Sequence, residues 1–220
     1  MVPDRGAPDR CPTEHPIDAA LPAHDAADGR LAYDWRAPSP PEEHATSRTT
    51  RKVEGVQNIS RMCLVCGTEN AFGLHARFYE LAAGREGGGP EILGIFTPRE
   101  EHQSYPGRLH GGVSSAILDE TIGRAILTLE PGAWGVTAEF KVRFRKPLPL
   151  DEDIRCIARI TRDSSRLFEG SGEIVLADGS VAVEATGKYV KMPITDIAAA
   201  EFVEREWFAD LRERPGEVEV

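Results

Sequence analysis

Apolar residues in the middle of the chain follow the spacing of a buried helix. Between residues 111 and 129 they occupy most of the helical circumference, at Val113, Ala116, Ile117, Leu118, Ile122, Ala125, Ile126, Leu127 and Leu129. A helix that is apolar nearly all round is buried, not laid on a surface. The pattern therefore predicts a long central helix, which Pro131 and Gly132 end.

Alternating apolar residues predict strands on both sides of this helix. The strands are expected at residues 75–81, 91–97, 133–146, 153–161, 168–176 and 181–191. An Asp-Gly pair at residues 178–179 is a hairpin signal between the last two strands. The order of two strands, a long helix and four strands in meander predicts an α+β fold, with one antiparallel sheet wrapped around the helix.

The two ends of the chain differ from this core of residues 53–193. Residues 1–52 are rich in proline and lack an apolar period, so we expect a disordered or peripheral extension. In residues 194–220, apolar residues at helical spacing predict a C-terminal amphipathic helix followed by a charged tail. These residues are Ile197, Ala198, Phe202, Trp207 and Leu211.

Charge and cysteine content narrow the classes of function. The 220 residues carry a net charge of −10, which argues against a nucleic-acid partner or an anionic membrane surface. No apolar run reaches the roughly 18 residues of a membrane span, and no secretory signal is visible. The 4 cysteines include a single CxxC pair, so we expect a cytoplasmic protein.

The most informative stretch is the start of the central helix. His110, Gly111 and Gly112 lead into it, and Asp119 follows eight residues after Gly111. A carboxylate among apolar residues is costly unless it is used or paired. Asp119 is therefore a candidate functional residue. The alternatives are a structural ion pair of Asp119 with Arg124 or Lys141, and a working role for the adjacent Glu120.

Several segments together resemble the hotdog-fold acyl-CoA thioesterases of the PaaI (phenylacetate-pathway) type, in the 4-hydroxybenzoyl-CoA thioesterase-like superfamily. The segments are CLVCGTENAFGL (63–74), HQSYPGRLHGG (102–112), VSSAILDETIG (113–123) and GVTAEFKVRFRKPLP (135–149). The resemblance covers roughly residues 60–192. It implies a hotdog fold, hydrolysis of an acyl-CoA to a free acid and CoA, and a homodimer or dimer of dimers. It implies no cofactor beyond the CoA of the substrate.

The resemblance also implies roles for the helix residues. Unpaired N–H groups at Gly111 or Gly112 would polarise the thioester carbonyl, and we favour Gly111. Asp119 would act as general base or as nucleophile. Eight residues of helix span about 12 Å, so Asp119 cannot lie beside the donors of its own chain. In hotdog dimers, the resemblance implies, the two groups come from different subunits.

Three further residues are candidate auxiliaries by the same resemblance. Gln103 lies in the loop where related enzymes place an Asn or Gln that holds water or the acyl carbonyl. Thr137 matches a Ser/Thr position that assists the water, although β-propensity alone would also explain a threonine in a strand. His110 could orient the loop or contact the acyl thioester, or it could be a structural hydrogen-bond partner of the backbone.

Two clusters have both a functional and a structural interpretation. Arg143, Arg145 and Lys146 lie near Lys141 on the strand after the helix, where they could bind CoA phosphates or form a solvated face. Cys63 and Cys66 could bind zinc with His75 as a third ligand, but a second ligand pair is missing. We therefore favour structural burial of the two cysteines and predict no metal.

Two other functions are compatible with the sequence. A hotdog dehydratase or hydratase would act on acyl thioesters through a histidine and an acid in a different arrangement. A non-catalytic acyl-CoA or lipid-binding module would keep the glycines at the helix start and would not need Asp119.

Overall fold

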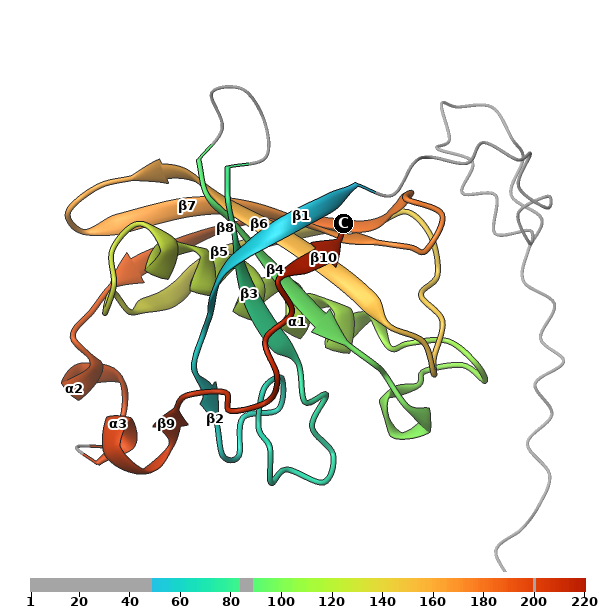
Figure 1. Ribbon diagram of the computed structural model, residues 1–220, viewed down its shortest axis with the longest axis horizontal. Helices are drawn as coiled ribbons and strands as arrows, with labels where there is room; N and C mark the ends of the chain where they lie inside the picture. The colour runs from blue at the N-terminus through green and yellow to red at the C-terminus, as the bar shows by residue number, and fades with distance from the viewer. Residues whose placement is uncertain (1–48, 84–88, 200) are drawn as a thin grey trace, which may run out of the picture. The chain divides into compact units, whose positions relative to one another are not determined.

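The computed structural model describes residues 49–83, 89–199 and 201–220. In this part, one antiparallel sheet of eight strands wraps around the helix α1 (Gly111–Ala125), as Figure 1 shows. The strands are β1 (Thr50–Val56), β3 (Arg77–Leu81), β4 (Glu91–Phe96), β5 (Gly135–Phe144), β6 (Ile154–Asp163), β7 (Leu167–Val175), β8 (Val181–Lys191) and β10 (Glu217–Glu219). The predicted α+β hotdog architecture is confirmed. Predictions for residues 1–48 lie outside the described residues.

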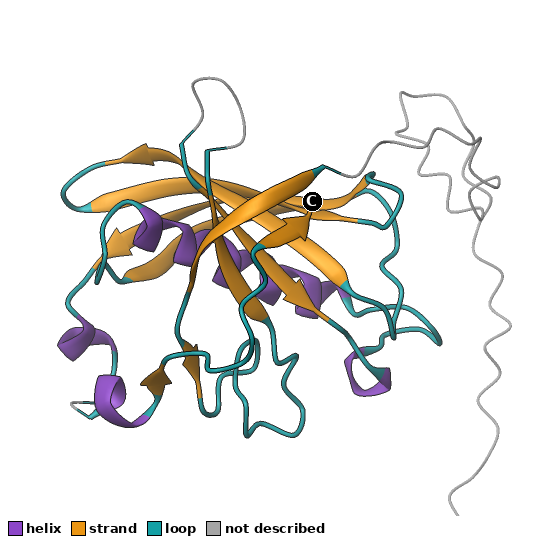
Figure 2. Ribbon diagram, viewed as in Figure 1, coloured by secondary structure: helices purple, strands orange, loops and turns teal. Residues whose placement is uncertain are grey.

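The central helix is buried as its composition predicts. Ile117, Leu118 and Ile122 are at most 1% exposed and pack against the sheet. The α-helix ends at Ala125 and continues as a 3-10 turn, η2 (Ile126–Thr128), so the predicted end near residue 129 is nearly right. Figure 2 shows the helix crossing one face of the sheet, where it contacts β4, β5, β6, β7 and β8.

The strand order corrects the predicted meander. It runs β10-β1-β3-β4-β6-β7-β8-β5, so β5 pairs with β8 and lies at the edge of the sheet. Of the four described strands that follow α1, only β6, β7 and β8 form a meander, and β6 pairs with β4 on its other side. Alternation along a strand identifies the strand and not its neighbours, which is why the sequence pattern could not place β5.

The C-terminal segment is not the predicted single amphipathic helix. It forms two one-turn helices, α2 (Ile194–Ile197) and α3 (Phe202–Arg205), and the short strand β9 (Trp207–Phe208). The chain becomes extended after α2, at Ala198 (φ −131°, ψ 166°). β9 then pairs with β2 (Ile59–Ser60). Contacts of the aromatic side chains with the domain thus replace the regular helix that their spacing predicted.

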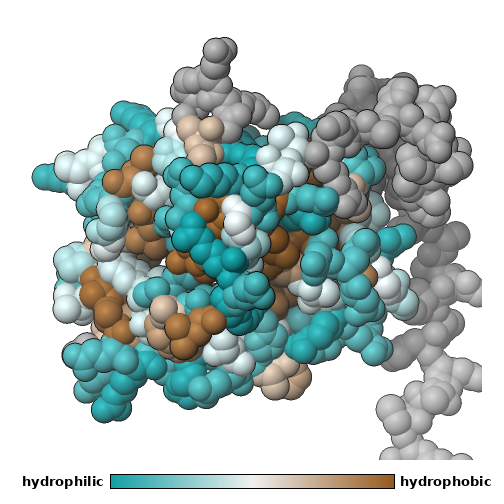
Figure 3. Space-filling model, in the orientation of Figure 1, coloured by the Kyte–Doolittle hydropathy of each residue, from teal (hydrophilic) through white to brown (hydrophobic). Residues whose placement is uncertain are grey.

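The last strand, β10, pairs with β1, which begins at Thr50, within the stretch that the sequence placed in the extension. A small second apolar cluster, separate from the main core, includes Val53, Tyr79 and Val218. The face drawn in Figure 3 is mostly hydrophilic, with separate hydrophobic patches. Within the described ranges, no helix is long and apolar enough to cross a membrane.

Candidate active site

Asp119 lies on α1 and faces two strands. The Thr137 hydroxyl on β5 donates a hydrogen bond to Asp119 Oδ1 at 2.9 Å, and the Tyr189 hydroxyl on β8 donates to the same oxygen at 3.1 Å. Asp119 Oδ2 accepts no hydrogen bond from the described residues. The two donors therefore fix the carboxylate and leave one oxygen for a water molecule or a substrate carbon.

Burial changes the acid-base properties of this group. Desolvation raises the pKa of Asp119, the hydrogen bonds from Thr137 and Tyr189 lower it, and the Glu120 charge raises it, with a net upward shift. A carboxylate with a raised pKa is a stronger base. Burial and the Asp119 charge also raise the pKa of Tyr189, which keeps its hydroxyl protonated as a donor.

The ion-pair alternative for Asp119 is not what the structure shows. Arg124 Nε donates to Glu120 Oε1 at 2.7 Å, so Arg124 pairs with the neighbouring carboxylate. Across the described part of the chain, Asp119 has no ion-pair partner within 4 Å, Lys141 included. Glu120, the rival candidate, is held by Arg124, while Asp119 is held by neutral donors only.

Tyr189 is a site residue that the sequence interpretation missed. It faces inward on β8, and its ring stacks on Phe168 with ring centres 4.9 Å apart. A Cβ atom at Gly187 would lie 2.7 Å from the Tyr189 hydroxyl, so glycine makes room for the ring. The sequence did contain an indication of this role: Tyr189 occupies a core-facing position of its strand, and a buried tyrosine hydroxyl needs a hydrogen-bond partner.

The Tyr189→Phe variant is expected to lower kcat about tenfold, because a hydrogen bond to a charged group contributes about 1.5 kcal/mol or more. The lost donor also lets the pKa of Asp119 rise further. The acidic limb of the pH–kcat profile should therefore move to higher pH, which a purely structural defect would not cause. Tyr105→Phe, in an exposed loop, is the matched control. An unshifted acidic limb would contradict the role of Tyr189.

The start of α1 has a different set of partners. His110 is the N-cap, and its Nδ1 accepts the Gly112 N–H at 2.8 Å. Of the two roles left open for His110, the structure thus shows the backbone contact. The Gly111 N–H donates to no acceptor in the described residues, so it can donate to a ligand. A Cβ atom at Gly111 would lie 3.3 Å from the ring of Phe144, at the end of β5.

The loop before α1 contacts the residues that lead into the helix, and it does not contact Asp119. Gln103 forms an isolated bridge with Leu109 and does not line the pocket at Asp119. The buried His102 accepts the Arg99 N–H at Nδ1 and contacts the Phe72 carbonyl through Nε2, both at 2.9 Å. Gln103 therefore lies beside the residues just before Gly111, away from Asp119.

A pocket of about 300 Å³ opens in front of Asp119 and Thr137. Its apolar wall contains Leu127, Ala133, Trp134, Phe202 and Trp207. The ring centres of Trp134 and Trp207 lie 5.1 Å apart, and those of Trp134 and Phe202 lie 5.7 Å apart. Phe202 and Trp207 come from the C-terminal segment, to which the sequence assigned no function.

The positively charged residues after the helix are exposed, as predicted. Arg145 and Arg143 both pair with Glu184 on the neighbouring strand, at 2.7 and 3.7 Å. Lys146 Nζ donates to the Ser180 hydroxyl at 2.8 Å. Acidic and polar side chains on the neighbouring strand and its turn therefore partly neutralise these cations, which remain accessible to solvent.

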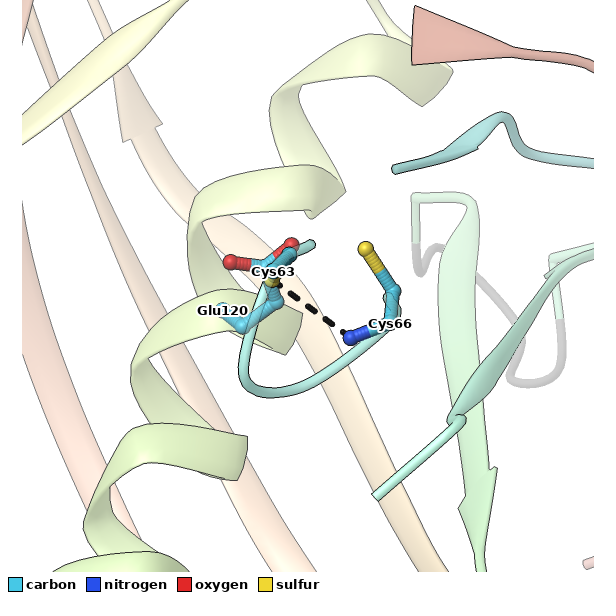
Figure 4. Close-up of side chains that lie close together, drawn as sticks. All are labelled: Cys63, Cys66 and Glu120. Atoms are coloured by element: carbon cyan, nitrogen blue, oxygen red, sulfur yellow. Dashed lines mark hydrogen bonds between the residues drawn. The ribbon is translucent and has the colours of Figure 1, made fainter. Parts of the chain in front are cut away.

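The structure also changes the candidate metal ligands. Figure 4 shows the side chains of Cys63, Cys66 and Glu120 close together. Their ligand atoms, one from each residue, all lie within 4.8 Å of one another. His75, the predicted third ligand, is not part of this group; it lies in a left-handed backbone conformation with φ of 51°. The third ligand candidate comes instead from the central helix.

Comparison with known proteins finds similarity to thioesterases. Residues 106–183 match the Thioesterase superfamily. Acyl-coenzyme A thioesterase 13 of Homo sapiens is 34% identical over 91 residues, covering 41% of this chain and 60% of that protein. A solved thioesterase superfamily protein is 29% identical with a TM-score of 0.52, covering 67% of this chain and 70% of that chain. The match to the human relative thus spans less than two thirds of its length.

Proposed function

Since residues 106–183 match the Thioesterase superfamily, we propose that the chain hydrolyses an acyl-CoA thioester to the free carboxylic acid and CoA. The observation that carries the proposal is the Asp119 carboxylate, with Thr137 and Tyr189 on one oxygen and the pocket before it. In the reaction, oxygen from water adds to the carbonyl carbon, the carbon–sulfur bond breaks, and the CoA sulfur leaves and takes a proton.

Asp119 supplies the activating group in this scheme. As a general base, it removes the proton of the attacking water through Oδ2. As a nucleophile, the same oxygen attacks the carbonyl carbon and water hydrolyses the resulting anhydride. In both routes the Gly111 N–H at the helix start stabilises the negative charge on the carbonyl oxygen.

The complete site requires two copies of the chain. Asp119 contacts Thr137 near the beginning of β5, whereas Gly111 lies beside Phe144 at its end. Antiparallel pairing of β5 with the β5 of a second copy would bring the beginning of one strand to the end of the other. Asp119 of one subunit then lies near Gly111 of the partner subunit, and one interface carries two sites.

The exposed β5 edge supports this assembly. Among the described strands, β5 pairs only with β8, and its ten residues present unpaired backbone groups on the other side. Val136 is 39% exposed and Phe144 is 45% exposed. A long, partly apolar edge strand is an aggregation hazard unless another strand covers it. We propose a homodimer formed through β5 as the minimal active unit.

The exposed cations give a test of CoA binding. If Arg143, Arg145 and Lys146 contact the CoA phosphates, the Arg145→Ala/Lys146→Ala double variant should raise KM for acyl-CoA about tenfold. KM for the matching acyl-pantetheine, which lacks the phosphates, should stay unchanged. Arg162→Ala, an exposed cation on β6, is the control. Equal effects on the two substrates would contradict phosphate binding.

Release of free thiol from a panel of acyl-CoA thioesters tests the function itself. The panel should contain short, long and aromatic acyl groups, because the pocket wall is aromatic. We expect turnover of at least one member, with the acid and CoA formed in equal amounts. Tight binding without thiol release would favour the acyl-CoA-binding module. Hydration of an enoyl-CoA thioester without release of thiol would favour the dehydratase or hydratase alternative.

A further inference from the structure

The turn that carries Cys63 and Cys66 packs against α1 at Glu120, on the wall of the same pocket (Figure 4). We propose that Cys63, Cys66 and Glu120 bind a thiophilic divalent cation, for which Zn²⁺ fits the donor set. Two sulfurs and one carboxylate oxygen are ordinary zinc ligands. The two cysteines have CxxC spacing, and the fold supplies the third ligand from a residue 54 positions after Cys66.

The cysteine turn is built to hold a thiolate. The N–H groups of Val65 and Cys66 donate to Cys63 Sγ at 3.3 and 3.5 Å. Gly67 closes the turn with a hydrogen bond to the Cys63 carbonyl at 2.8 Å, where a Cβ atom would lie only 2.3 Å from that oxygen.

Arg124 holds the other two ligands in place. Its guanidinium donates to Glu120 Oε1 at 2.7 Å and to Cys66 Sγ at 3.2 Å, while a third bond reaches the Asn58 carbonyl at 2.7 Å. Glu120 Oε2 is left for a cation, and hydrogen bonds of this kind orient metal ligands. Two thiolates and one carboxylate carry three negative charges, which a divalent cation and Arg124 balance.

The spacing fits a small cation after a modest adjustment. Zinc–sulfur bonds of about 2.3 Å in a tetrahedron separate the ligand atoms by about 3.8 Å. The three atoms already lie within 4.8 Å of one another, so small side-chain rotations complete the geometry. Cys63 and Glu120 both line the pocket, so the fourth position opens toward it. The cation would tie the segment between β2 and β3 to the central helix.

Zinc titration of the reduced full chain against a chromophoric chelator tests the proposal. We expect one equivalent of Zn²⁺, and Co²⁺ should give a sulfur-to-cobalt charge-transfer band and strong visible bands of a tetrahedral site. Cys63→Ser and Glu120→Gln should each weaken binding at least about tenfold. Cys156→Ser, a buried thiol outside the group, should bind like the unmodified chain.

Glu120→Gln keeps an acceptor for Arg124, so it remains informative if Cys63→Ser does not fold. The readouts are metal binding and spectra, which do not depend on thioesterase activity. Absence of zinc uptake by protein whose thiols are all reduced would overturn the proposal. Unchanged affinity in the Glu120→Gln variant would overturn the three-ligand assignment.

Discussion

The Asp119→Asn variant is expected to lose at least about 100-fold in kcat, because the amide cannot accept a proton or attack a carbonyl at neutral pH. The side-chain oxygen of asparagine can still accept the hydrogen bonds from Thr137 and Tyr189. The fold and the pocket should therefore persist. Thiol release from the best acyl-CoA of the panel measures the effect, with Asp196→Asn at the exposed start of α2 as the control.

The same variant has an expected effect on stability. Because burial raises the pKa of Asp119 in the folded state, its stabilising contribution is present below the unfolded-state pKa. This contribution is lost as pH rises through the folded-state pKa. Asp119→Asn should thus have an equal or higher Tm than the unmodified chain at neutral pH, and this advantage should shrink in acid. Full activity, or a large loss of Tm at neutral pH, would contradict the assigned role.

The Gly111→Pro variant is expected to reduce kcat by about 100- to 1,000-fold, the usual cost of losing one oxyanion donor. Proline removes the Gly111 N–H and suits the first position of a helix. His110 before it already has the extended backbone that proline requires, with φ of −67° and ψ of 133°. The helix should therefore begin at the same residue in the variant.

Gly111→Ala is the matched control, because it adds a Cβ atom beside Phe144 but keeps the N–H. The half-exposed Phe144 ring can move by the few tenths of an ångström that this requires. We expect Gly111→Ala to retain most of the activity that Gly111→Pro loses. Similar losses in both variants would mean that crowding, and not the missing donor, causes the defect.

Local patterns were sufficient to predict α1 and the six strands β3 to β8, but not β1, β2, β9 or β10. Apolar spacing identified α1 and the strands around it because the period of buried residues differs between helix and strand. The spacing of Asp119 from Gly111 identified two groups that one helix cannot bring together. Thr137 was expected from family resemblance, and its hydroxyl does contact Asp119.

Contacts between distant segments could not be predicted in the same way. Tyr189 reaches Asp119 because β8 packs against α1, and alternation along a strand does not specify which helix residue its side chains meet. Phe202 and Trp207 showed helical spacing, but packing with Trp134 decided their conformation. The residue beside the two cysteines is Glu120 of α1, and not His75, which is closer to them in the sequence.

Subunit complementation tests most directly the central claim that each site combines two chains. Asp119→Asn and Gly111→Pro homodimers are each expected to be inactive. After mixing in equal amounts and subunit exchange, half of the dimers are mixed, and each has one site with both native groups. The account predicts recovery of about one quarter of the unmodified activity. No recovery after demonstrated exchange would contradict it and place both groups in one chain.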